Sequence, residues 1–280
     1  MSSSLSYLTT LYSDAFGGGS SLLDTIYGIG TSSAGSADPL QSLASAEQNQ
    51  TQDVKLAAAQ PMVQSAIKGF TEAVQSAKSM TQLLANPAFM NVLLTANGMS
   101  DQIGYTALAT QALTSNLSDT NSLANQLTDT RWKTLAGDYN FTASGLASFQ
   151  KPATIAAIAN LYATNTWETS QDSVTPGLSN ALSFKPLAST ITSVDQILGN
   201  PTMRAVVTTA LGIPEQIAFQ SLTAQENAIS TRIDIKKFQD PKFVETFLQQ
   251  YLIANAASST SSASTPDLTT LAVQGQGFLA

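Results

Sequence analysis

Residues 82–103, QLLANPAFMNVLLTANGMSDQI, align without a gap on residues 196–217, QILGNPTMRAVVTTALGIPEQI, and ten of the 22 positions are identical. A weaker match pairs residues 127–141 with residues 238–252. The residues that define the shared unit are Asn86, Pro87 and Gly98 in the first copy and Asn200, Pro201 and Gly212 in the second. The sequence therefore indicates an internal duplication.

The shared unit reads as one helix between a start signal and a stop signal. Proline suits the first turn of a helix because it needs no amide hydrogen there. The apolar residues that follow it recur on one stripe, and glycine then supplies the left-handed residue that ends the helix. A single unit of this size has a marginal core. We therefore expect the two copies to pack face to face as a pseudo-two-fold pair.

Helical spacing of apolar residues continues on both sides of the repeated stretch. It predicts helices over residues 54–80 (with a boundary near Pro61), 103–113, 123–139, 155–167 and 243–251. The last helix has a strong start signal, because the acid Asp240 precedes Pro241. No segment shows a convincing period of two. The sequence predicts an all-α, multihelical fold made of two related repeat units packed together.

The two ends of the chain differ from its middle in composition. Residues 1–50 are rich in Ser, Gly and Ala, and residues 254–266 are a Ser/Thr/Ala stretch before a mildly apolar tail. Such segments contain little apolar area to offset the entropy of ordering. The expected organisation is a flexible, low-charge N-terminal segment over 1–50, repeat unit 1 over 51–150, repeat unit 2 over 151–253, and a linker with an apolar tail over 254–280.

Cysteine and histidine are both missing from the chain. Their absence excludes disulfides, thiolate metal sites, cysteine nucleophiles and Ser-His-Asp triads, and we expect no metal and no cofactor. The net charge is −7, and the 12 basic residues are unclustered apart from Lys236-Lys237, which argues against nucleic-acid binding. Ser, Thr, Asn and Gln make up 103 of the 280 residues. Polarity of this kind favours a structural protein over an enzyme.

Membrane and targeting signals are weak. The first basic residue is Lys55, so the N-terminus lacks the positive region of a secretory signal peptide. No stretch approaches the apolar length of a membrane span, and none is expected. Two locations remain open: the cytoplasm, or the flagellum and the exterior of the cell by flagellar export, a route that would use the N-terminal segment.

The blocks occur in a defined order: an SMTQLL or SVDQIL helix start, the Asn-Pro helix, ANGM or ALGI at its end, a middle helix, and then LANQLTDTRWKTLAGDYNF. This order resembles an alphaproteobacterial family called domain of unknown function 1217, over residues 63–141 and 177–252. Trp132 stands at the family's usual tyrosine, and Lys242-Phe243 replaces Arg-Tyr in the second copy. The resemblance implies a multihelical protein without assigned catalytic residues, whose genes often lie among flagellar genes.

The most distinctive local cluster is Arg131-Trp132 with Asp129. One interpretation makes Arg131, Trp132 and the equivalent Phe243 interface residues, because Trp and Arg are typical anchors of protein interfaces. The alternative places Trp132 in the core below an N-capping Asp129, with Arg131 bridging to a carboxylate. The acids Glu215, Glu226 and Glu245 are interpreted as solvated surface charges. No residue is assigned as catalytic.

Three functional hypotheses follow. The first is a non-enzymatic structural or accessory protein of the bacterial flagellar system, with export through the flagellar route as one option, whose partners are flagellar components or further copies of itself. The second is a cytosolic helical interaction module, such as an export chaperone or regulator, that binds a partner helix in an apolar groove. The third, least favoured, is a carboxylate hydrolase acting on cell-wall glycan, which needs a cleft with two carboxylates about 5–9 Å apart.

Overall fold

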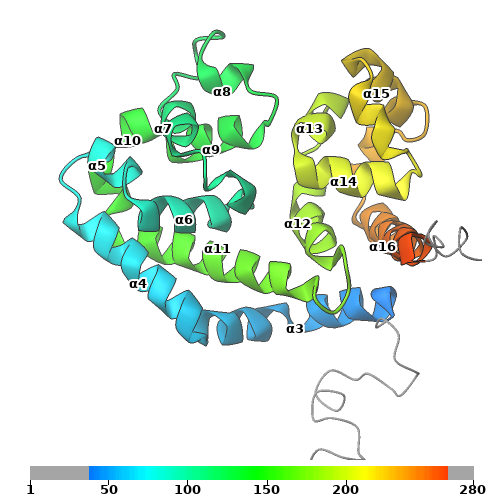
Figure 1. The fold of residues 1–280 in the computed structure, drawn as a ribbon, viewed down its shortest axis with the longest axis horizontal. Coiled ribbons are helices and arrows are strands. Elements are labelled where there is room, and N and C mark those ends of the chain that lie inside the picture. The colour runs from blue at the N-terminus through cyan, green and yellow to red at the C-terminus, as the bar shows by residue number, and fades with distance from the viewer. Residues whose placement is uncertain (1–37, 264–280) are drawn as a thin grey trace, which may run out of the picture.

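The computed structural model describes residues 38–263, and within that range the chain is helical with no strand. The all-α prediction is therefore confirmed. Figure 1 shows the helices. Their bounds are α3 Pro39–Ala59, α4 Pro61–Ser76, α5 Met80–Leu84, α6 Pro87–Ala96, α7 Thr106–Leu113, α8 Leu123–Gln126, α9 Arg131–Tyr139, α10 Phe141–Phe149, α11 Pro152–Gln171, α12 Leu178–Ala188, α13 Val194–Gly199, α14 Pro201–Ala210, α15 Leu222–Ser230 and α16 Pro241–Ala263, with 3-10 turns η1 Ser100–Gln102, η2 Glu215–Phe219 and η3 Ile235–Gln239.

Proline begins many of the helices. The six that start with it are α3, α4, α6, α11, α14 and α16. Proline fits there because the first turn of a helix has no intrahelical partner for its amide. At the predicted start of α16, Asp240 accepts a hydrogen bond from the backbone amide of Lys242 at 3.0 Å. Local sequence chemistry thus sets where these helices begin.

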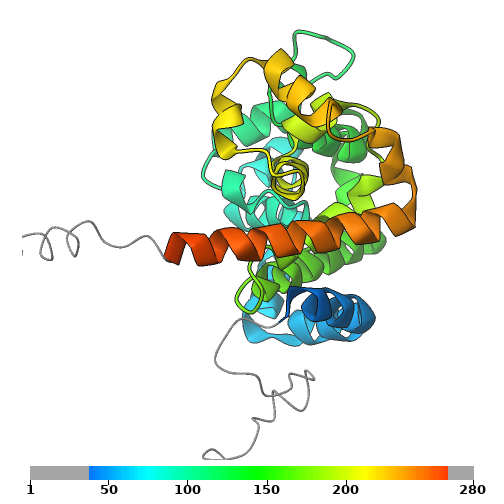
Figure 2. The same cartoon turned by 90° about the vertical axis from the view of Figure 1, so that its right-hand side faces the viewer.

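The helices form two lobes on a common base (Figure 1). The base consists of α3, α4 and α11, with α11 packed above the other two. Helix α6, which belongs to the first lobe, packs on α11 and α4. The first lobe contains α5 to α10, and the second contains α12 to α16. Helix α3 also contacts α12 and α16, so it joins the second lobe to the base. Figure 2 shows α16 running across the molecule, with its C-terminal end projecting beyond the other helices.

Each lobe has its own group of packed aromatic rings. In the first, Phe89 packs against Phe149 at 5.9 Å between ring centroids and against Phe70 of α4, in the base, at 5.6 Å. In the second, Phe238 packs against Phe184 at 5.6 Å and against Phe247 at 5.1 Å. Aromatic pairs at these separations stabilise a core beyond their buried area. The apolar residues of both lobes nevertheless belong to one continuous buried cluster.

The six residues that define the repeated unit take the backbone roles that their types suit. Asn86 and Asn200 cap α6 and α14 through their side-chain oxygens, and Pro87 and Pro201 follow them as the first helical residues. Gly98 and Gly212 have φ angles of 67° and 60°. Each stop carries the same pair of hydrogen bonds, Gly98 N to Thr95 O and Met99 N to Leu94 O in the first copy. The pseudo-two-fold arrangement of whole units stays a prediction.

The N-terminal helix begins earlier than expected. Residues 39–50, assigned above to a flexible segment, are the first part of α3, because Asp38 caps the helix by accepting from Leu40 N at 3.0 Å. Leu43 and Ala46 of this part are buried. Residues 1–37 of the expected segment lie outside the described residues. At the other end, α16 continues through Ala263 into the expected linker, and residues 264–280 are likewise outside.

The expected helix over 123–139 is interrupted. It divides into α8 and α9, and Leu127 between them has extended backbone angles. The interruption coincides with a contact between the lobes, because Thr130 N donates to Gly199 O of α13 at 2.8 Å. A β-carbon on Gly199 would lie 2.4 Å from Thr130 Cγ2 and 3.0 Å from Thr128 O. Glycine is therefore required at this close approach.

Helix α11 also departs from the expected division between the units. It begins the predicted second unit, yet it packs along α6 and α4 as well as α12. Just before it, Gln150 donates to the carbonyl oxygens of Val74 and Ala77 at 3.1 and 3.2 Å. A boundary between residues 150 and 151 thus falls inside a packed region rather than in a linker.

Candidate functional site

Arg131 lies at the start of α9 and forms the densest polar cluster among the described residues. Its guanidinium donates to both oxygens of Asp129, with Nη2 at 2.7 Å from Oδ2. It also reaches Asp101 at 3.0 and 3.2 Å and the carbonyl of Gly98 at 2.5 Å. The side chain is only 10% exposed. Arg131 therefore ties the glycine stop after α6 to the start of α9.

The electrostatics of this cluster favour the charged forms. Partial burial alone would raise the pKa of Asp101, but hydrogen bonds from Arg131 and its positive charge outweigh burial and lower that pKa. Burial likewise opposes the charge on Arg131, and Asp129 and Asp101 overcome it, so the pKa of Arg131 is raised. A buried cation with two carboxylates and a carbonyl is well satisfied. Its geometry suits a structural link.

The remaining candidate interface residues lie mostly inside the protein. Trp132 is 1% exposed, so its side chain presents no surface to a partner. Phe243 is partly buried and stacks on Phe247 at 5.7 Å, and Lys237 lies 5.7 Å from its ring centroid. Asp129, one residue before the N-cap Thr130, accepts from the amide of Arg131 at 3.0 Å. These positions fit the packing interpretation better than the docking one.

A second polar cluster joins three helices. Lys185 on α12 binds Glu47 on α3 at 2.5 Å and Glu245 on α16 at 2.8 Å. Burial opposes the charge on Lys185, but the two carboxylates outweigh it and raise the pKa of Lys185. All three side chains are between 26% and 38% exposed. Glu245 is thus an ion-pair partner that holds α16 and α3 to α12.

Glu168 is the one charged residue classed as buried in the described part of the chain, at 8% exposure on α11. Ser183 on α12 donates to its Oε2 at 2.6 Å. Burial raises the pKa of Glu168, and the bond from Ser183 only partly opposes that effect. No local sequence signal points to this residue, because burial of a single acid depends on how α11 and α12 pack.

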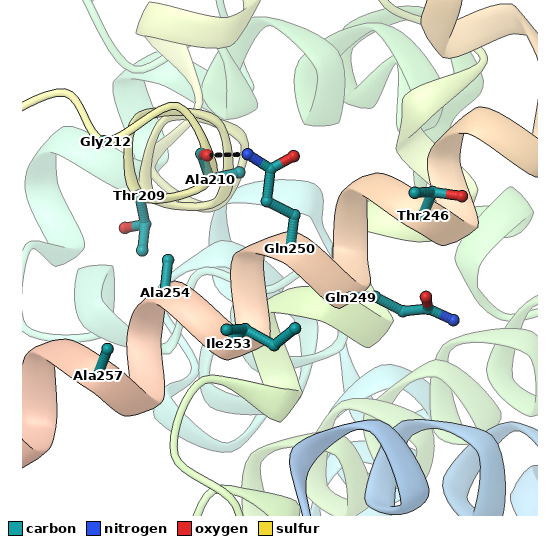
Figure 3. Close-up of a pocket in the computed structure, with 9 residues that line it drawn as sticks. All are labelled: Thr209, Ala210, Gly212, Thr246, Gln249, Gln250, Ile253, Ala254 and Ala257. Atoms are coloured by element: carbon teal, nitrogen blue, oxygen red, sulfur yellow. Dashed lines mark hydrogen bonds between the residues drawn. The ribbon is translucent and has the colours of Figure 1, made fainter.

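An open groove runs beside α14 and α16, with a volume of about 440 Å³ (Figure 3). Its surface is mostly apolar, and Gln250 spans it by donating to Ala210 O at 2.8 Å. Ile253 stands 55% exposed on its rim. The nine lining residues, none of them ionisable, are Thr209, Ala210, Gly212, Thr246, Gln249, Gln250, Ile253, Ala254 and Ala257. The groove lies within the second lobe and not between the two repeats.

The other acids are placed at the surface. Glu215 is exposed in η2, and Glu226 on α15 has its pKa raised by a side-chain hydrogen bond with Asp195. Within residues 38–263 no three acids gather as a metal site would require. The same residues contain no helix that is both long and apolar enough to cross a bilayer.

Comparison with known proteins places the chain. The family described as "Protein of unknown function (DUF1217)" matches residues 96–244, which is more than half of the chain. The chain belongs to the DUF1217 family. The match includes the Gly98 stop, the Arg131 cluster and residues 196–217 of the second copy. It ends at Val244, within the weaker repeated segment 238–252. The resemblance drawn from the sequence is therefore confirmed.

One solved structure is similar to this chain in fold. It is the crystal structure of an Agrobacterium tumefaciens protein, a structural-genomics target. The two chains are 26% identical with a TM-score of 0.66, and the match covers 80% of this chain and 96% of the other. No curated protein matches the sequence significantly. These comparisons place the DUF1217 chain in a family and a fold.

Proposed function

We propose that this DUF1217 protein is a non-enzymatic structural or accessory component of the bacterial flagellar system that works by binding other proteins. The observation that best supports a binding role is the groove of α14 and α16, which is open, mostly apolar and lined by uncharged residues. Concave, mostly apolar surface with a few polar groups is typical of binding sites. The flagellar part rests on the gene neighbourhood that the family resemblance brings.

Export is the finer part of the proposal. The chain contains no cysteine, which suits passage through an oxidising route, and the segment before Lys55 carries no basic residue. Because α3 starts at Pro39 and buries Leu43, the segment to remove is 1–37 rather than 1–50. A chain lacking 1–37 should keep its helical circular dichroism and disappear from the exported fraction. Secretion of this deletion at the level of the full chain would contradict the export part.

The second candidate is a cytosolic chaperone or regulator that holds a partner helix in the same groove. The groove favours it because Ile253 and the neighbouring alanines offer apolar contacts without charge. The two candidates differ in location. If the full chain stays in the cytosol bound to an export substrate, and Ile253→Asp releases that substrate, the second candidate replaces the first.

A further inference from the structure

Two aromatic side chains stand exposed at equivalent positions of the repeated stretch. Tyr105 is 60% exposed and Phe219 is 91% exposed. They end the segments DQIGY (101–105) and EQIAF (215–219), which lie at the same offset as the rest of the repeat. The match therefore extends two residues beyond Ile103 and Ile217, and it ends on an aromatic ring in both copies.

Both rings lie on the outer side of a short turn. In each copy the isoleucine two residues earlier packs against the core, so the short turn has an inner and an outer side. Tyr105 N donates to Gln102 O at 3.0 Å, and Gln220 N donates to Ile217 O at 3.0 Å. A single exposed apolar residue is ordinary on a protein surface. The same exposed type at the same position of two divergent copies is not explained by folding.

The surroundings of both rings are acidic. Asp101 and Glu215 precede the rings by four residues, and both are exposed. Asp101 keeps 52% of its side chain exposed although it pairs with the buried Arg131. Residues 97–130 and 205–231 contain no lysine or arginine, and Arg131, which follows the first of these stretches, is bound to both Asp101 and Asp129. A partner that complements this surface presents apolar side chains beside basic ones.

The helices that follow the two rings lie on the same side of the molecule. Helices α7 and α15, which follow the two aromatic residues, are both on the side of the lobes away from α3 and α4 (Figures 1 and 2). One partner can therefore approach both from a single direction. Two weak contacts made together bind more tightly than either alone.

We propose that Tyr105 and Phe219 form a two-point docking surface for a partner protein whose contacting segments combine basic and apolar side chains. The proposal goes beyond the binding role proposed above, because neither ring lines the groove of α14 and α16. Complementary charge argues for a foreign partner over a second copy, since the chain carries a net charge of −7.

The test measures binding of a fluorescein-labelled amphipathic peptide of leucine and lysine to the full chain by fluorescence anisotropy. The double variant Tyr105→Ala/Phe219→Ala should raise the Kd at least about tenfold, and each single variant should give an intermediate rise. Glu215→Gln should weaken the salt dependence of binding. Both rings are exposed, so unchanged circular dichroism and thermal melting should accompany these effects.

The matched control is Met62→Ala, which removes another exposed apolar side chain, 81% exposed on α4. The inference fails if the double variant binds the peptide as the unaltered chain does, or if Met62→Ala costs as much. It also fails if sedimentation shows self-association that the double variant loses, since the occupant is then a second copy. If the full chain is found in the flagellar fraction and the double variant binds the peptide as the unaltered chain does, this inference fails and the proposed flagellar role stands. If the double variant loses peptide binding but the full chain never reaches the flagellum, the inference is supported and the proposed flagellar role is contradicted.

Discussion

Arg131 and Glu168 are two largely buried ionisable residues whose surroundings differ. Arg131 has two carboxylates and a carbonyl around its guanidinium, so its charge is compensated where it lies. Glu168 has one hydroxyl, from Ser183, and otherwise lies among packed helices. The first arrangement stabilises the charged form, and the second opposes it. The two residues should therefore respond in opposite directions to pH and to neutral substitution.

Replacing Arg131 by alanine should lower the free energy of unfolding by about 2–3 kcal/mol, because Asp129 and the Gly98 carbonyl lose their donor. Asp101 has a pKa below its ordinary value of 3.8. Its contribution is therefore present above pH 3.8 and is lost as the pH falls through the lowered pKa. Urea unfolding should show a deficit at pH 7 that narrows at pH 3, with Arg131→Lys between the two. A deficit that is unchanged by acid would contradict this account.

Replacing Glu168 by glutamine should stabilise the protein at pH 7. Because the pKa of Glu168 is raised above 4.5, the folded state binds its proton more readily than the unfolded state does. The stability that this provides is complete below pH 4.5 and is lost as the pH rises through the raised pKa. Thermal melting should thus show a Tm for Glu168→Gln that is higher than that of the unaltered protein at pH 7 and equal to it at pH 4. The exposed Glu72→Gln serves as the control, and a lower Tm at pH 7 would refute the prediction.

At the scale of the elements, α3 connects the parts of the molecule. It packs on α11, α12 and α16. The hydroxyl oxygen of Ser42 on α3 accepts a hydrogen bond from the hydroxyl of the buried Thr175 at 2.8 Å. Lys185 adds ion pairs that join α12 to both α3 and α16. Removing the first half of α3 should therefore loosen the second lobe as well as the base.

Lys185→Met tests the ionic part of this connection. The pairs are partly exposed, so the loss should be modest, about 1 kcal/mol in the free energy of unfolding. Lys68→Met is the matched control, since Lys68 is 77% exposed and its contact with Glu72 is 3.8 Å long. It should change stability by no more than about 0.3 kcal/mol. Equal losses in the two variants would show that Lys185 has no special role in joining the helices.

At the scale of the whole molecule, the lobes meet where α13 passes the start of α9. A β-carbon at Gly199 would meet the side chain of Thr130 and also the backbone oxygen of Thr128, and turning the Thr130 side chain would relieve only the first of these contacts. The equivalent position in the first copy of the repeat is Ala85. Glycine at 199 is thus a feature of the junction and not of the repeated unit.

Gly199→Ala should cost about 1–3 kcal/mol, because its β-carbon would overlap Thr130 Cγ2. The amide of Thr130, which donates to Gly199 O, should also exchange with solvent faster. Gly104→Ala is the control, since nothing lies within 4 Å of a β-carbon there. Unfolding in urea and hydrogen exchange measure both effects. If Gly199→Ala and Gly104→Ala have the same free energy of unfolding, the close contact at Gly199 does not hold the lobes together.

Local signals made part of this structure predictable. Asn-Pro and Asp-Pro starts and the stops at Gly98 and Gly212 depend on neighbouring residues, and the helices begin and end there. The interruption before α9 was not predictable, because it coincides with a backbone bond to a residue 69 positions away. Lys185 and Glu168 were missed for the same reason. Phe219 was within reach, since extending the repeat by two residues pairs it with Tyr105.

Cell fractionation tests most directly whether the protein belongs to the flagellar system, as we propose. The tagged full chain should be found with purified hook–basal bodies or in the culture medium, and both signals should vanish in a strain without the flagellar export apparatus. A chain that stays entirely in the cytosol, absent from both fractions in flagellated cells, would contradict the account.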